Sequence, residues 1–343
     1  MREPAFWWRA RAGITARLLA PVAMLYGTIA RMRLSRGGRR AVAPVVCIGN
    51  PTVGGAGKTP MALAVARMLR EAGEQPIFLT RGYGGALAGP VLVEPKQHFA
   101  LDVGDEPLLL AGVAPTVVAR DRVAGARSAV AAGATVIVMD DGFQNPGLHK
   151  DVSLLVVDER RGIGNGRVIP AGPLRVPLAA QLARAHAFVA VGAPSGAAEV
   201  RAQARKCNLP VFQAHLQPEK DFIAALGPGR VLAFAGIGDP EKFFTSLSDA
   251  GISVAATQSF PDHHRYTRAQ AQALCKQAAD DGLILVTTEK DLARMRGDDE
   301  VAELAAHAHA LPVALVLDER QAFKAFLLDR VAATKASCRS RSS

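Results

Sequence analysis

Short hydrophobic runs recur along the chain, separated by turns or by stretches with helical spacing. A run of four or five apolar residues without polar alternation is typical of a strand in a parallel sheet that is covered on both faces. Because such runs alternate with helical stretches, the pattern predicts an α/β fold. The strands predicted in the first part of the chain are residues 45–48, 76–80, 135–139, 153–157 and 187–191.

The pattern breaks at the turn-rich sequence LGPGR, residues 226–230, and then restarts. We therefore expect a core domain over residues 41–227 and a second, smaller α/β lobe over residues 228–330. The last residues, 331–343, are predicted to form a disordered tail. The apolar runs that define the second lobe are residues 231–238, 253–260, 283–291 and 313–319.

The first 40 residues have a different pattern. Their longest uncharged run spans only residues 18–30 and contains Pro21, whereas a membrane-spanning helix needs about 20 apolar residues. Both tryptophans of the chain, Trp7 and Trp8, lie in this segment, which suits an anchor at the level of lipid headgroups. Residues 1–40 are thus predicted to contain a basic amphipathic helix that lies on an anionic membrane surface. The side chains expected to enter the acyl boundary are Leu18, Leu19, Met24 and Leu25.

The positive charge of the chain is concentrated in the same segment. Nine arginines and one glutamate give residues 1–40 a charge of +8, out of +10 for the whole chain. A basic protein often binds nucleic acid, but the tryptophans and the apolar run favour a membrane surface instead. The alternative is a helix that packs on the protein's own core with its arginines in water. Nothing in the sequence indicates an obligate protein partner. The four cysteines are widely spaced, a pattern typical of a protein from a reducing compartment.

The sequence PTVGGAGKTP, residues 51–60, resembles a phosphate-binding loop that follows a strand and opens a helix. Lys58 is expected to reach the β- and γ-phosphates of ATP, and Thr59 to offer its hydroxyl to Mg²⁺. Pro60 fits the first helical turn, where a backbone N–H has no partner. Thr52 replaces the first glycine of the common motif and is tolerated if its φ is negative. The predicted nucleotide-binding residues are Thr52, Val53, Gly54, Gly55, Ala56, Gly57, Lys58 and Thr59.

An acidic pair, Asp140 and Asp141, directly follows the predicted strand at residues 135–139. In P-loop proteins, an acid at the end of a buried strand holds Mg²⁺, directly or through water. The sequence leaves open which of the two carboxylates binds the ion. By itself, an acidic pair after a strand is more often the cap of the next turn; the P-loop makes the metal-binding interpretation the better one.

Other P-loop classes fit the sequence less well. TEKD, residues 288–291, keeps only the aspartate of the guanine-reading motif N-K-x-D, which disfavours a GTPase. The loop also lacks the additional lysine that partitioning and targeting ATPases carry near its start. The alternative that remains is a membrane-associated switch ATPase or GTPase that phosphorylates no lipid.

Nine segments carry a resemblance that is far more specific than the P-loop. They are GNPTVGGAGKTP, LTRGYGG, GDEP, VVARDRV, MDDGFQ, PAGPLR, FAGIGDPEKFF, FPDHHRYT and TTEKDLARM. Together they resemble the tetraacyldisaccharide 4'-kinase family, the lipid A kinases of Gram-negative bacteria. The resemblance implies transfer of the γ-phosphoryl group of ATP to the 4'-hydroxyl of a tetraacyldisaccharide 1-phosphate, giving lipid IVA. It also implies a peripheral or monotopic protein on the cytoplasmic face of the inner membrane, with a P-loop NTPase-like parallel-sheet core.

The resemblance also assigns roles to residues. Asp105, in GDEP, matches the proposed general base, and His263, in FPDHH, matches its partner, although His264 is adjacent. Lys58 and Asp141 complete the catalytic set that it implies. Because His263 lies in the second lobe, we expect the active site in a cleft between the lobes. Weaker candidates for substrate or phosphate contacts are Glu106, Arg122, Arg81, Tyr83 and Arg175.

Overall fold

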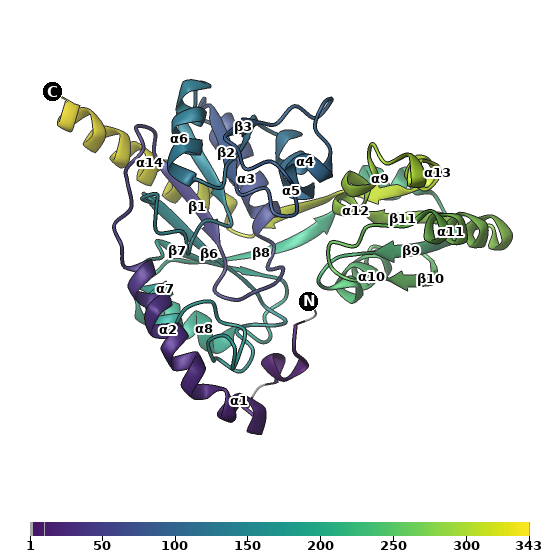
Figure 1. Ribbon diagram of the computed structural model, residues 1–343, viewed down its shortest axis with the longest axis horizontal. Coiled ribbons are helices and arrows are strands. Elements are labelled where there is room, and N and C mark those ends of the chain that lie inside the picture. Colours follow the sequence, from purple (N-terminus) through teal and green to yellow (C-terminus); the bar gives the residue numbers. More distant parts are fainter. Residues whose placement is uncertain (1–2, 10, 343) are drawn as a thin grey trace.

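The structure is a computed structural model that describes residues 3–9 and 11–342, and a nine-stranded sheet lies at the centre of its larger lobe (Figure 1). The strand order is β13-β8-β7-β6-β1-β5-β2-β4-β3. All neighbouring strands are parallel except β3 and β13, which run antiparallel at the two edges. The strands are β1 (Val45–Gly49), β2 (Pro76–Thr80), β3 (Val91–Leu92), β4 (Thr116–Val118), β5 (Val136–Asp140), β6 (Val152–Asp158), β7 (Ala187–Val191), β8 (Val211–Pro218) and β13 (Val313–Leu317).

Helices cover both faces of this sheet. Alternate residues of β1 show the division, because Val46 and Ile48 enter one hydrophobic core and Val45 and Cys47 enter the other. The first core contains α3 (Lys58–Glu71), α5 (Asp105–Ala111) and α14 (Arg320–Ser342); the second contains the end of α2 (Ala20–Leu34), with α6 (Arg122–Ala131), α7 (Leu178–Leu182) and α8 (Ala198–Lys206). A sheet buried on both faces explains the uninterrupted apolar runs and confirms the predicted parallel-sheet α/β core.

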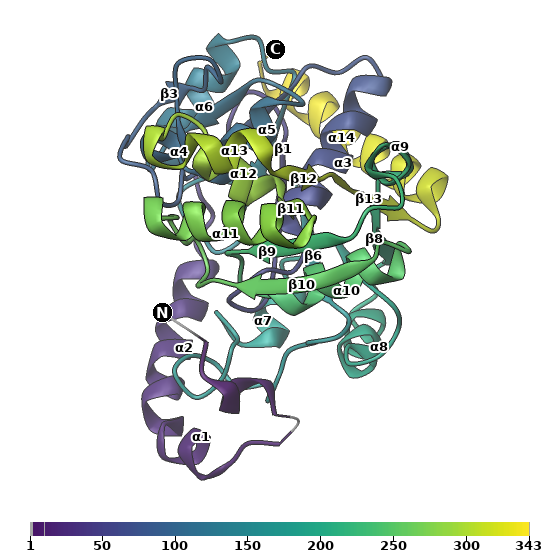
Figure 2. The same ribbon diagram turned by 90° about the vertical axis from the view of Figure 1, so that its right-hand side faces the viewer.

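The smaller lobe is built on a parallel sheet in the order β10-β9-β11-β12 (Figure 2). Its strands are β9 (Val231–Ala235), β10 (Val254–Ser259), β11 (Ile284–Thr288) and β12 (His309–Leu311). Its helical elements are α9 (Lys220–Leu226), α10 (Pro240–Asp249), α11 (Arg268–Asp281), α12 (Glu289–Met295), η2 (Asp299–Val301) and α13 (Ala302–His307). Apolar side chains from α10 pack on one face of the sheet and those from α11 and α13 on the other.

Two boundaries differ from the sequence-based prediction. The chain leaves the smaller lobe after β12, because β13 pairs with β8 and the helix after it buries Phe323 and Leu327 in the core of the larger lobe. The segment 331–343, predicted as a disordered tail, is instead the end of α14 as far as Ser342, and Ser343 lies outside the described residues. Val331 is buried, and the alanine and basic residues that follow favour continuation of an anchored helix.

The N-terminal segment begins with η1 (Ala5–Trp8), and both tryptophans contact the larger lobe. Trp7 Nε1 donates to the carbonyl oxygen of Pro170 at 2.9 Å, and the guanidinium of Arg161 lies 4.9 Å from the ring centre of Trp8. Both side chains are half-buried, so their positions do not support the predicted headgroup anchor. Arg2, one of the nine arginines of this segment, lies outside the described residues.

The helices α1 (Ile14–Leu18) and α2 lie at the edge of the molecule in both views (Figures 1 and 2). Along most of α2 the residues that face the protein are small: Ala23 and Gly27 are buried, and Leu34 at the end of the helix is the one large buried residue among those described. Large apolar side chains point outward instead, so α2 lacks the simple division into an apolar and a basic face that was predicted. Leu19 is half-buried rather than fully outward. Within the described residues, no helix has both the length and the apolar character that crossing a bilayer requires.

Candidate active site

The phosphate-binding loop connects β1 to α3, and its backbone requires glycine at two positions. Gly54 and Gly57 have φ of +89° and +84°, a region that side chains rarely allow. Thr52 is not among the residues with positive φ, which is why a hydroxyl residue can replace the first glycine. Its carbonyl oxygen accepts a hydrogen bond from Arg175 Nε at 2.9 Å. Pro60 lies in the first turn of α3, as predicted.

The remaining loop residues frame this turn. The backbone N–H of Val53 donates to the carbonyl oxygen of Pro173 at 2.9 Å, and Ala56 is buried. Gly55 is exposed, and a Cβ there would meet no atom within 4 Å. Val53 and Ala56 thus fix the loop against the rest of the lobe, while Gly55 is exposed to solvent.

Asp141 is held by two cations at the mouth of the loop. Arg175 Nη1 donates to its Oδ1 at 3.0 Å, and Lys58 Nζ lies 3.8 Å from the same oxygen. Burial alone would raise the pKa of Asp141, but Lys58 and Arg175 hold it below its usual value. Lys58 also donates to Asn50 Oδ1 at 3.2 Å. Asp141 is therefore an ionised group that positions the lysine of the loop.

Asp140, at the end of β5, is almost completely buried. Thr59 Oγ1 donates to its Oδ2 at 3.2 Å, while its buried Oδ1 has no hydrogen-bond partner. Burial, with help from the negative charges of Glu106 and Asp141, raises the pKa of Asp140 to about 7. An unpartnered buried carboxylate oxygen is costly and marks a place for a cation. Together with a hydroxyl, it fits Mg²⁺, which needs few protein ligands when phosphate and water supply the others.

The described residues contain no group of three or more His, Cys, Asp or Glu side chains that could hold a metal ion. A Mg²⁺ site of the P-loop type needs no such cluster, because one carboxylate and one hydroxyl suffice beside the phosphates. Thr59 and Asp140 are the residues that meet this requirement.

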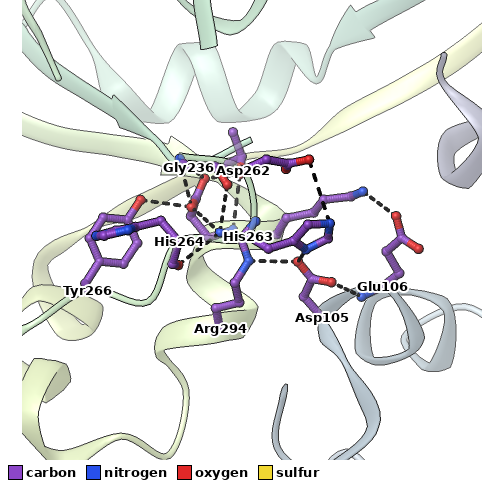
Figure 3. A network of polar contacts seen from close by, with 11 residues as sticks. Asp105, Glu106, Gly236, Asp262, His263, His264, Tyr266 and Arg294 are labelled. Carbon is purple, nitrogen blue, oxygen red and sulfur yellow. Dashed lines mark hydrogen bonds and ion pairs between the residues drawn. The ribbon is translucent and has the colours of Figure 1, made fainter. Parts of the chain in front are cut away.

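Asp105 and His263 meet across the two lobes (Figure 3). Asp105 is the first residue of α5 and is buried, and its Oδ2 lies 3.3 Å from Nδ1 of His263 in the loop between β10 and α11. The ring of Tyr83 lies 5.1 Å from the ring of His263. His264 turns away, with Nε2 2.9 Å from Gln270 Oε1. Of the two adjacent histidines, His263 is thus the one that reaches Asp105.

Backbone strain is concentrated at two of these positions. His263 and Asp141 have φ of +56° and +49°, and in the described residues only one other non-glycine residue, Asn208, has a positive φ. Such conformations cost free energy and persist where the surrounding structure imposes them, which is common at functional sites.

Two cations of α12 complete the site, and the sequence-based candidates did not include them. Arg294 Nε donates to Asp105 Oδ2 at 2.7 Å, and Lys290 Nζ donates to Glu106 Oε1 at 2.6 Å (Figure 3). Burial would raise the pKa of Asp105, but His263, Arg294 and Lys290 bring it well below its usual range. The hydrogen bond to Asp105 in turn raises the pKa of His263. The i,i+4 spacing of the two cations in TTEKDLARM was the available signal.

The other predicted rim residues differ in role. Arg122 is buried and bonds the carbonyl oxygen of Ala119, and burial lowers its pKa to about 10, with a contribution from Arg81. Arg81 and Tyr83 are exposed. Of these three residues, Tyr83 is the one with a described contact to a catalytic candidate, the ring of His263.

A second set of contacts joins the lobes on the β6 side. Lys242 of α10 forms an ion pair with the buried Asp158, and Arg161 Nη2 lies 3.3 Å from Asp239 Oδ2. Charged contacts thus join the two lobes at two separate places, on the β6 side and at α12.

Comparisons with known proteins agree with this geometry. The model of the tetraacyldisaccharide-1-P 4'-kinase family (LpxK) matches residues 15–332. The tetraacyldisaccharide 4'-kinase of Nitrobacter winogradskyi is 52% identical over 97% of this chain and 98% of its own, and that of Methylobacterium nodulans is 53% identical over 97% and 96%. A crystal structure of LpxK from Aquifex aeolicus in complex with ATP superimposes with a TM-score of 0.72 at 28% identity, covering 93% of this chain and 99% of that one.

The motifs predicted from the sequence, the P-loop core and these matches over nearly the whole length agree with one another. The chain therefore belongs to the tetraacyldisaccharide-1-P 4'-kinase family, whose reaction is the ATP-dependent phosphorylation of the 4'-hydroxyl group in lipid A biosynthesis.

Proposed function

We propose that the 4'-hydroxyl group of the lipid is phosphorylated in the cleft between the two lobes, with Asp105 as the general base. The observation that carries this proposal is a buried, ionised carboxylate of the larger lobe that is bonded by His263 of the smaller lobe. Phosphoryl transfer needs positioning, charge neutralisation and an acceptor for the hydroxyl proton. Asp105 supplies the last of these.

The P-loop supplies the first two. ATP binds with its phosphates against the backbone N–H groups of residues 54–59, and Lys58 moves from Asp141 to the β- and γ-phosphates. Thr59 and Asp140 would hold Mg²⁺, which would neutralise charge on the phosphate oxygens. Before ATP binds, Asp141 keeps Lys58 beside the loop, and Arg175 holds Asp141 in place.

The phosphoryl transfer makes one bond to phosphorus and breaks another. The 4'-hydroxyl oxygen forms a bond to the γ-phosphorus as its proton passes to Asp105, and the bond from that phosphorus to the β,γ-bridging oxygen breaks. ADP leaves with the electron pair of that bond. His263 holds Asp105 from the opposite lobe, so the base is in place when the lobes are together.

We also propose that α1 and α2 hold the protein on the cytoplasmic face of the inner membrane. Leu18, Met24 and Leu25 are 76%, 73% and 66% exposed, and these outward side chains match the acyl boundary predicted for them. Arg17 and Arg31 lie nearby and are exposed, as binding to anionic headgroups requires. Because the acyl chains of the substrate remain in the bilayer, this position brings the cleft to the acceptor sugar.

A phosphotransfer assay with wild type beside Asp105→Ala tests the proposal. Purified protein is incubated with labelled ATP, Mg²⁺ and tetraacyldisaccharide 1-phosphate in mixed micelles. We expect label on the lipid with wild type, and a loss in kcat of at least about 100-fold in the variant with little change in ATP binding. Label that appears only as free phosphate would favour a switch ATPase, and an active Asp105→Ala protein would remove the base assignment.

A further inference from the structure

Arg294 links the proposed base to the interior of the smaller lobe. Its side chain is only 7% exposed, and its Nε donates to Asp105 Oδ2 across the lobes. Its Nη1 donates to Asp291 Oδ1 and to the carbonyl oxygen of Gly236, each at 2.9 Å (Figure 3). A guanidinium has fixed donor directions, so bonds on two sides of the group determine its orientation.

Asp291 is fixed by its own lobe. It is completely buried and accepts hydrogen bonds from Tyr266 Oη at 2.8 Å, Thr288 Oγ1 at 2.6 Å and the backbone N–H of Gly236 at 3.0 Å. These donors come from three separate parts of the lobe. Contacts within the smaller lobe therefore fix the position of Arg294 independently of its contact with Asp105.

The two oxygens of Asp105 are bonded unequally. Oδ2 receives both side-chain donors, Arg294 Nε and His263 Nδ1. Oδ1 accepts one hydrogen bond, from the backbone N–H of Glu106 at 2.9 Å. Because a carboxylate oxygen has two acceptor positions, Oδ1 keeps one for a further donor. The acceptor hydroxyl can fill that position.

We infer that Arg294 is a positioning residue of the phosphoryl transfer: by holding Oδ2 of Asp105, it leaves Oδ1 to receive the proton of the acceptor hydroxyl, and it does so only when the two lobes are together. This inference rests on the assignment of Asp105 as the base. It adds a residue in the smaller lobe whose effect on the reaction passes through that base. The smaller lobe thereby assembles the base as well as covering the cleft.

The charges around Asp105 fix the sign of the pH effect. The loop before α11 presents His263 to Asp105, and Asp262 lies on the far side of that ring. The helix α12 presents Arg294 and Lys290. The helix that carries Asp105 presents Glu106. Loss of Arg294 removes one of three cations, so the pKa of Asp105 rises toward its usual value. The base is then protonated at a higher pH, and the acid limb of the rate profile moves upward.

The test compares Arg294→Gln and Arg294→Lys with wild type in the phosphotransfer assay between about pH 3 and pH 8, a range that includes the usual aspartate pKa of about 3.9. For Arg294→Gln we expect kcat to fall roughly 100-fold, as for a misplaced catalytic group, with KM for ATP nearly unchanged. Its acid limb moves upward, toward the usual pKa of an aspartate, and Arg294→Lys restores part of both. Arg296→Gln, at the exposed residue directly after the same helix, is the control with unchanged kinetics.

A loss of kcat that is equal at every pH, or a loss of thermal stability alone, overturns the inference, because a merely structural arginine acts in this way. If Arg294→Gln does not fold, Tyr266→Phe replaces it: this variant removes one donor to Asp291 and keeps the ring. We then expect a smaller loss of kcat with the same direction of pH shift, and wild-type kinetics overturn the inference.

Asp105→Asn, measured in parallel, separates the two proposals. Near-normal kcat in that variant means that Asp105 is not the base, and the proposed function fails whatever Arg294 does. An inactive Asp105→Asn protein together with unchanged kinetics in Arg294→Gln refutes only the role of Arg294.

Discussion

At the scale of single residues, the site separates the two carboxylates that the sequence left equivalent. Asp140 is buried, with an oxygen that has no hydrogen-bond partner, whereas Asp141 is paired with Lys58 and Arg175. Asp140 ends β5 and Asp141 begins the turn after it, so a difference of one position leaves one carboxylate at the proposed Mg²⁺ site and the other beside Lys58.

We predict that Asp140→Asn and Asp141→Asn fail in different ways. Asp140→Asn loses a charged Mg²⁺ ligand, so the Mg²⁺ concentration for half-maximal rate rises at least about 10-fold. Asp141→Asn lowers kcat by freeing Lys58 but leaves the Mg²⁺ dependence unchanged. A titration of the initial rate with Mg²⁺ measures both, and the opposite pattern would exchange the two assignments.

The residue scale also shows where sequence reasoning stops. Lys58 could be named from the P-loop pattern, whereas Asp105 and His263 could be named only through the family resemblance. Arg294 could not, since its role depends on Asp291, Gly236 and Asp105 converging from separate elements of both lobes. Helical spacing shows that Lys290 and Arg294 share a face but not what that face meets.

At the scale of elements, the buried strands were predictable and the marginal ones were not. β2 and β7 coincide with the predicted runs, since burial on both faces leaves an uninterrupted apolar sequence. β4 has only three residues, and β8 alternates between buried and exposed positions, so neither gives such a run. In α2, small residues mark the packed face and large apolar ones the outer face, the reverse of the usual rule for a surface helix.

We predict that the outer face of α1 and α2 determines membrane binding without contributing to the fold. Leu18→Ser combined with Leu25→Ser should weaken co-sedimentation with anionic vesicles roughly 100-fold, about 10-fold for each leucine removed from the acyl boundary. The melting temperature should not change, because both side chains are exposed. Val42→Ser, at a residue that is 79% exposed but outside the helices, is the matched control. Unchanged vesicle binding of the double variant would show that another surface binds the membrane.

At the scale of the whole molecule, the two sheets and the contact of Asp105 with His263 across them were predictable, because the strand pattern restarts after residue 230 and the site residues fall on both sides of the break. The return of β13 to the first sheet was not. An edge strand that pairs antiparallel with β8 has the same local pattern as a strand of the second lobe, and only long-range pairing distinguishes them.

We predict that the ion pair between Lys242 and Asp158 stabilises the arrangement in which the two lobes are in contact. Lys242→Ala leaves Asp158 buried without its cation, so kcat should fall and KM for ATP should rise together, by roughly 10-fold in kcat/KM. Lys276→Ala, an exposed lysine of α11 in the same lobe, serves as the control. A folded Lys242→Ala protein with wild-type kcat/KM would mean that the α12 side alone holds the lobes together.

The return of the chain to the larger lobe has a consequence for biosynthesis. Phe323, Leu327 and Val331 of α14 fill the same core as Met61 and Leu69 of the helix that carries the P-loop. The lobe that carries the P-loop is therefore discontinuous in sequence, and its core is complete only when residues 323–331, which follow the smaller lobe in the chain, have left the ribosome. The strands of the smaller lobe, β9 to β12, all precede β13 and α14 in the chain, so they are synthesised before the core of the larger lobe is complete. A nascent chain can thus form the lobe that delivers His263 and Arg294 before the lobe that they serve.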